Sequence, residues 1–102
     1  MIFIYITAGN IEDAKKISRH LLEKKLIACV NIFPIQSMYW WKSGIQDDTE
    51  FAIIAKTIDS NFKSVREETK KIHTYETPCI VSWKIDNADP DYEKWIEKES
   101  KK

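Results

Sequence analysis

The 102 residues of the chain match the common size of one domain, so we expect a single domain over residues 1–102. Sixteen basic and sixteen acidic residues cancel, and 43% of the residues are apolar, which favours a folded, soluble protein over a disordered tail. The balanced charge, with no stripe of Lys and Arg among aromatic residues, argues against a nucleic-acid-binding protein.

The first half of the chain predicts a strand, a helix and a second strand. Residues 2–6 are apolar on both alternating faces, as in a central strand. Asn10 is expected to cap a helix that runs to about Lys25, with an inward stripe of Ile11, Ala14, Ile17 and Leu21. Residues 26–33 follow as a strand, and Pro34 then removes a ladder donor, which predicts a kink or an edge position.

Residues 37–41, Ser-Met-Tyr-Trp-Trp, continue or restart that strand. Residues 42–44 form a turn, and the polar residues 46–50 lead into a third strand at 51–57. Residues 26–57 are therefore expected to make a long, bent hairpin.

The second half predicts a helix, a strand and a last helix. Asp59 or Ser60 is expected to cap a helix that ends near His73, with an inward stripe of Phe62, Val65, Thr69 and Ile72. Residues 79–85 alternate as a fourth strand with one face drier than the other, and Asp89-Pro90 starts the last helix. The order is βαββαβ plus a C-terminal helix, an α+β arrangement in which helices cover one face of an antiparallel sheet.

The other face of this sheet has no cover within the chain. In a strand, Tyr39 and Trp41 point to one side and Trp40 to the other, and one small core cannot easily hide both sides. Such an apolar surface exceeds what a soluble monomer usually exposes, so we expect another copy of the chain to cover it. The alternative is that the rings form a local satellite core.

The N-terminal residues lack the basic region of a signal peptide, and no apolar run is long enough to span a bilayer. We therefore expect a cytoplasmic protein without membrane contact. Cys29 and Cys79 are too few for a disulfide framework and lie in apolar runs, where a reduced thiol is expected to pack as a small hydrophobe.

Motifs along almost the whole chain resemble one family. They are Thr7, Ala14 and Leu21-Leu22; LIACVNI with Ala28, Cys29 and Asn31; SMYWW with Tyr39 and Trp41; Glu50 and Lys56-Thr57; HTYETP with His73, Tyr75 and Pro78; and DYEKWI. Together they resemble the CutA1 divalent-cation tolerance proteins. The resemblance implies a ferredoxin-like fold with an extended hairpin of the second and third strands, assembled as a homotrimer whose sheets face one another around a threefold axis.

The resemblance further implies a role in divalent-cation tolerance, with copper or another divalent cation bound weakly and not required for folding. It implies an intersubunit cleft formed by Cys29, Asn31, Tyr39, Trp41, Glu50, Lys56 and Tyr75. For Glu50 and Lys56, a buried ion pair that sets strand register is an equally good interpretation.

His73 is the candidate metal ligand that the resemblance points to, although a lone His at a helix end is more often structural. Relatives often carry a cysteine and a second histidine where this chain has Ile6 and Ile72. Copper bound through His73 is therefore expected to be weak, or to need Cys29, Cys79 or a carboxylate from a neighbouring chain.

The chain also departs from the family in the hairpin turn and beside Tyr75. Lys42 stands where an acid is usual and the glycine has moved by one position, so the tip is expected to bend differently. Thr74 replaces a typical proline, which frees one backbone donor.

No motif for catalysis is present: there is no Ser-His-Asp order, no phosphate-binding glycine loop and no HExxH sequence. The carboxylates of residues 86–91 have calcium-like spacing, but helix capping is the better interpretation. We expect a protein that is not an enzyme. Two alternatives stay open, a PII-like sensor of a small ligand and a hydrolase that uses the intersubunit cleft.

Overall fold

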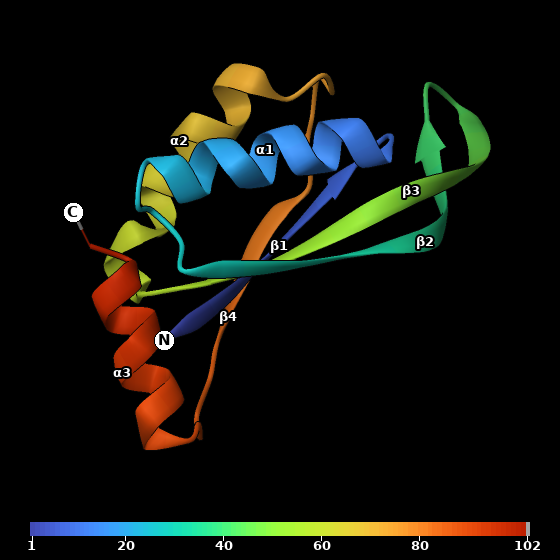
Figure 1. The fold of residues 1–102 in the computed structure, drawn as a ribbon. Coiled ribbons are helices and arrows are strands. Elements are labelled where there is room, and N and C mark those ends of the chain that lie inside the picture. The colour runs from blue at the N-terminus through green and yellow to red at the C-terminus, as the bar shows by residue number, and fades with distance from the viewer. Residues whose placement is uncertain (102) are drawn as a thin grey trace.

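The computed structural model describes residues 1–101, and within them it contains one four-stranded sheet and three α-helices (Figure 1). The strands are β1 (Ile2–Ala8), β2 (Cys29–Trp41), β3 (Gly44–Thr57) and β4 (Ile80–Lys84); the helices are α1 (Ile11–Glu23), α2 (Phe62–Ile72) and α3 (Pro90–Glu99). A 3₁₀ turn, η1 (Asp59–Asn61), precedes α2. This order confirms the predicted βαββαβ pattern with an additional C-terminal helix.

The sheet has the order β2-β3-β1-β4, with all neighbours antiparallel, and α1 and α2 lie on the same face (Figure 1). Alternate residues of β1 point toward these helices, so Ile2, Ile4, Ile6 and Ala8 are at most 1% exposed. They pack with Ile53 and Ala55 of β3 and with inward residues of both helices. The core therefore lies between one face of the sheet and the two helices.

Local signals in the sequence explain both ends of α1. The Asn10 side chain accepts a hydrogen bond of 2.8 Å from the backbone N–H of Asp13, which confirms the predicted cap. At the other end Lys25 has a positive φ of 58°, and its N–H and that of Leu26 bond back to the carbonyls of Leu22 and Leu21. The helix therefore ends at Glu23, two residues before the predicted end.

The last helix, α3, packs beside the end of β3. Asp89 accepts hydrogen bonds from the N–H groups of Asp91 and Tyr92, which confirms the cap. Ile96 is fully buried, and Glu99 forms an ion pair of 2.7 Å with Lys25.

The cap predicted for the second helix is wrong. Asp59 lies in η1, and the N-cap of α2 is Asn61, whose side chain makes no capping bond. The Asn61 amide instead donates to the carbonyls of Leu26 and Ser100. The side chain at the N-cap position thus forms tertiary hydrogen bonds and does not cap the helix.

The hairpin is longer and more regular than predicted. β2 begins at Cys29 rather than residue 26 and continues through Pro34, which is accommodated because β2 is an edge strand. β3 begins at Gly44, so the polar residues 46–50 belong to the strand. Side chains of β2 form hydrogen bonds with Asp47, Asp48 and Thr49, including Gln36 to Asp47 at 2.7 Å.

The two-residue turn at Lys42-Ser43 has positive φ at both positions, 50° and 67°. This hairpin reaches well beyond the core (Figure 1), and the molecule measures 45 × 26 × 21 Å. Within residues 1–101, none of the helices has the length and apolar content needed to cross a membrane.

Candidate functional site

The sheet face opposite α1 and α2 has no layer of helices over it. Strand pairing places one set of side chains there, which we call the open face: Phe3, Tyr5, Thr7, Cys29, Asn31, Phe33, Ala52, Ile54, Lys56, Val81 and Trp83. Phe33, Val81 and Trp83 are 37%, 51% and 43% exposed. The face of β4 predicted to be drier, with Val81 and Trp83, is therefore the one left uncovered, and Ile80 packs on the core instead.

The seven residues expected to share a cleft fall into two groups within one chain. Tyr39, Trp41, Glu50 and Tyr75 line a pocket, whereas Cys29, Asn31 and Lys56 lie at the other end of the open face. Six positions of β3 separate Glu50 from Lys56, a distance of about 20 Å along a strand. A single cleft built from all seven would need more than one copy of the chain.

At the far end, Lys56 is 7% exposed. Its ammonium donates to Oδ1 of Asn31 and lies 5.6 Å from the centre of the Phe3 ring. No carboxylate of residues 1–101 lies within ion-pair distance of Lys56, so Glu50 and Lys56 form no ion pair within one chain. Neutral groups satisfy this buried charge within the chain.

Cys29 lies beside Lys56 and contacts α3. Its Sγ is 3.5 Å from the hydroxyl of Tyr92, and this hydrogen bond, together with burial, raises the pKa of Tyr92 to about 12. Both cysteines are free thiols. Cys29 thus ties the last helix to the edge strand.

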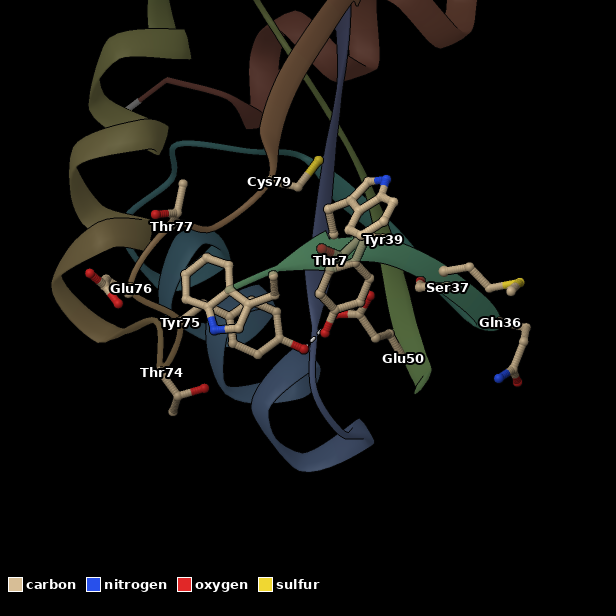
Figure 2. Close-up of a pocket in the computed structure, with 13 residues that line it drawn as sticks. Thr7, Gln36, Ser37, Tyr39, Glu50, Thr74, Tyr75, Glu76, Thr77 and Cys79 are labelled. Carbon is tan, nitrogen blue, oxygen red and sulfur yellow. Dashed lines mark hydrogen bonds between the residues drawn. The ribbon is translucent and has the colours of Figure 1, made fainter. Parts of the chain in front are cut away.

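The pocket lies between the hairpin and the segment that joins α2 to β4, and it has a volume of about 830 Å³. Figure 2 shows the side chains around it. Its lining consists of Thr7, Gln36, Ser37, Met38, Tyr39, Trp40, Trp41, Glu50, Thr74, Tyr75, Glu76, Thr77 and Cys79. This volume falls in the range of sites that bind small molecules.

A buried carboxylate lies at the base of the pocket. Glu50 is only 6% exposed, and the Tyr75 hydroxyl points at it and donates a hydrogen bond to Oε2 (Figure 2). Burial and this hydrogen bond raise the pKa of Tyr75 well above its ordinary value, so Tyr75 stays a neutral donor. Gly9 makes room for it, because a Cβ there would lie 3.2 Å from the Tyr75 hydroxyl oxygen.

Aromatic rings of the hairpin form one wall of the pocket. The Tyr39 hydroxyl donates to Asp48 at 2.7 Å, and this bond raises the pKa of Tyr39. Tyr39, Trp40 and Trp41 are 39%, 71% and 41% exposed, so none of them is buried within the chain. The side with Tyr39 and Trp41 is more covered by its own subunit than the side with Trp40, whereas the expected satellite core is wrong.

Both ring nitrogens of His73 have protein partners. The backbone N–H of Tyr75 donates to Nδ1 at 3.0 Å, and since an amide can only donate, Nδ1 carries no hydrogen. The hydrogen is therefore on Nε2, which donates to the carbonyl of Thr7 at 2.7 Å. In this arrangement His73 ties the helix end to β1 and orients Tyr75, as in the structural alternative.

The residues of one chain do not fit a bound divalent cation. Among residues 1–101 no three side chains of His, Cys, Asp or Glu are grouped to hold a metal ion. His73 has no free nitrogen. Metal binding therefore stays a prediction that depends on ligands from more than one subunit.

Three pocket residues, Gln36, Glu76 and Thr77, were not singled out by the sequence analysis. For Glu76 and Thr77 the sequence offers only their place in the chain. They lie in the polar segment between α2 and β4, which passes the end of the sheet where α2 stops. Cys79, which was proposed only as a ligand for a neighbouring chain, also lines the pocket, and burial raises the pKa of its thiol.

A family model described as CutA1 divalent ion tolerance protein matches residues 2–99 of the chain. The divalent-cation tolerance protein CutA of Archaeoglobus fulgidus is 50% identical over 95 residues, which cover 93% of each of the two chains.

Solved structures of CutA proteins also superpose on this chain. The periplasmic divalent cation tolerance protein CutA from Archaeoglobus fulgidus superposes with a TM-score of 0.96 at 48% identity, over 99% of this chain and all of the other. The PII-like protein CutA from Nostoc sp. PCC 7120, in apo form, superposes with a TM-score of 0.92 at 25% identity, over 99% and 98% of the two chains.

Proposed function

The chain belongs to the CutA1 divalent ion tolerance protein family, and on this premise we propose that it acts as a homotrimer that contributes to divalent-cation tolerance by binding metal ions at sites shared between subunits. The observation that carries the proposal is the open face. Phe33 on β2 and Val81 and Trp83 on β4, at the two edges of the sheet, are exposed on this face. Burying such a surface is the main source of free energy for subunit association.

The test of assembly is sedimentation equilibrium of the full chain at micromolar concentration. A trimer has three times the subunit mass of 12.0 kDa. A folded species of 12.0 kDa at that concentration would contradict the proposal.

Shared sites are proposed because single-chain donors do not converge. Copper prefers soft sulfur and imidazole ligands, and the chain offers the two free thiols Cys29 and Cys79. Their thiolates, with a carboxylate from another subunit, would hold the ion. Isothermal titration with copper should give similar affinities for the wild type and His73→Ala, and a clear loss for the double variant Cys29→Ser, Cys79→Ser.

A PII-like role as a sensor of a small ligand is the second candidate, and the pocket of about 830 Å³ favours it. A sensor should change the conformation of the segment at residues 73–79 when its ligand binds. Hydrogen exchange of this segment with and without ligand measures that change.

We propose binding rather than catalysis as the role of the pocket. Tyr75 stays protonated and donates its hydroxyl hydrogen to Glu50, so neither group is free to act on a substrate as an acid or a nucleophile. A screen for hydrolysis with Glu50→Gln as control tests this. Turnover that this substitution abolishes would assign the pocket to a hydrolase instead.

We further propose a cytoplasmic location on the ground of the two free cysteines, although the Archaeoglobus relative is described as periplasmic. Fractionation of producing cells, with the redox state of both thiols determined in each fraction, tests it. Recovery in the periplasm would overturn this part of the proposal.

A further inference from the structure

The charge of the pocket indicates the sign of its ligand. Among the described residues that line it, Glu50 and Glu76 are acidic, and none is Lys, Arg or His. Asp48 adds a further carboxylate behind Tyr39. Lys42, which follows Trp41 in the chain, is exposed in the hairpin turn with Nζ 5.9 Å from the centre of the Trp41 ring. The lining that one chain supplies therefore attracts cations and repels anions.

Only one of the two carboxylate oxygens of Glu50 accepts a hydrogen bond from the described residues. Tyr75 donates to Oε2 of Glu50, and no hydrogen bond to Oε1 comes from residues 1–101. In this part of the chain, the side-chain atoms that are buried without a partner are Thr69 Oγ1 and Ser100 Oγ, so Oε1 of Glu50 keeps some accessible surface although the residue is only 6% exposed. Because Glu50 lines the pocket, a ligand donor there would complete its hydrogen bonding.

The walls suit an organic cation. Tyr39, Trp40, Trp41 and Tyr75 supply four aromatic rings, whose faces attract ammonium groups. The Lys42 ammonium already rests near Trp41, so this ring is accessible to a cation. Hydroxyls of Thr7, Thr74 and Thr77 can accept hydrogen bonds from N–H donors.

The size of the pocket separates an organic cation from a bare metal ion. Calcium and magnesium ions need oxygen ligands converging at about 2.0–2.6 Å. The carboxylates here line a space of about 830 Å³, and no group of three metal-binding side chains is present in residues 1–101. A molecule of several heavy atoms matches this space better than an ion does.

We propose that this pocket binds a small organic ammonium compound, with one ammonium group at Glu50 and its alkyl part against Tyr39 and Trp41. The inference rests on the small-ligand candidate of the proposed function and names the class of ligand for it. It does not require the metal sites.

Isothermal titration of the full chain in phosphate buffer tests it, since common amine buffers would compete. The probes are tetramethylammonium, 1,4-diaminobutane and, as an anion of similar size, propionate. Both cations should bind and propionate should not. Absence of heat from both cations at millimolar concentration, or equally tight binding of propionate, would overturn the proposal.

Two variants locate the site. Glu50→Gln should weaken diaminobutane about tenfold or more, because a charged hydrogen bond becomes a neutral one. Trp41→Leu should weaken tetramethylammonium about fivefold through loss of the cation–π contact. The matched control Glu97→Gln removes a carboxylate from the exposed surface of α3 and should change neither affinity. Unchanged cation binding in both pocket variants would contradict the assignment.

The second variant keeps the test decisive if Glu50→Gln does not fold, which circular dichroism will reveal. Copper titration and sedimentation separate the two proposals. If a trimer binds copper but no ammonium probe, the present inference fails and the proposed function stands. If the probes bind a single subunit that takes up no copper, the proposed function fails and the inference stands.

Discussion

The two faces of the sheet differ in how completely the chain satisfies them. On the helix-covered face Ile4, Ile6 and Ile53 are entirely buried, whereas on the open face Val81 and Trp83 remain about half exposed. The same strands contribute to both faces, because successive side chains alternate. The chain therefore buries one face of its sheet and leaves large apolar side chains exposed on the other.

The largest expected effect concerns the core between the sheet and the helices α1 and α2. Ile6→Ala should lower the free energy of unfolding by about 2–5 kcal/mol, since it leaves a cavity under two helices. Denaturant titration at fixed protein concentration measures this loss. Glu97→Ala on the exposed side of α3 is the control, with a change of about 0.5 kcal/mol or less. A loss below about 1 kcal/mol for Ile6→Ala would place the core elsewhere.

The second effect concerns the open face. Trp83→Glu should weaken subunit association by about a hundredfold or more, because a charge would be buried where an indole packs. The circular dichroism of the subunit should be retained. Leu22→Glu is the matched control, because Leu22 is exposed to a similar degree, 37%, but belongs to α1 and not to the open face. Sedimentation equilibrium compares the two, and equal masses for both variants would remove the distinction between the faces.

A third, smaller effect concerns the hairpin that carries the pocket wall. Ser43→Gly should raise the free energy of unfolding by about 1 kcal/mol, because Ser43 has a φ of 67° that glycine adopts without strain. The same substitution in an extended strand, Ser82→Gly, should lower it by about 0.5–1 kcal/mol. Denaturant titration checks both signs, and two losses would mean that the turn is not strained.

The smallest effect lies on the outer surface of the helix layer. Hydrogen bonds from Lys71 and His20 lower the pKa of Glu68 from 4.5 to about 2. A carboxyl with a lowered pKa in the folded state stabilises the protein above its unfolded pKa, and this contribution is lost as the pH falls from about 4.5 to about 2. Glu68→Gln should therefore flatten the pH dependence of stability in that window.

The loss of stability at low pH should be small, because water screens the charge of Glu68. Added salt should reduce this loss further. Glu67→Gln, one position away and exposed, is the control. Thermal unfolding followed between pH 2 and 5 measures both variants. Identical pH profiles for wild type and Glu68→Gln would show that the protonation of Glu68 is not coupled to folding.

Local signals predicted the elements well where the interacting groups are close in sequence. The caps at Asn10 and Asp89 and the end of the second helix at His73 were all found, because each depends on neighbours within a few residues. The local pattern of residues 46–50 predicts a polar connection, whereas the structure holds them in a strand through pairing with residues 35–39. Cross-strand partners are invisible to a local pattern.

The candidate site shows the same limit more sharply. Motif resemblance selected Glu50 and Tyr75, which the fold brings into a hydrogen bond across 25 positions of the chain. It also selected Lys56, which the fold places at the other end of the open face. His73 was the candidate ligand, but the carbonyl of Thr7 and the amide of Tyr75 occupy its nitrogens. The residue types alone did not show which of these residues meet in the pocket.

The sequence by itself determined the order of the elements, the alternation that separates an inner from an outer sheet face, and the family. These follow from side-chain periodicity and from capping, which act within a few residues. Only the tertiary structure decided which of these residues meet, because strand register and the path from α2 to β4 set distances between segments far apart in the chain. The buried carboxylate with its aromatic wall is a product of that register.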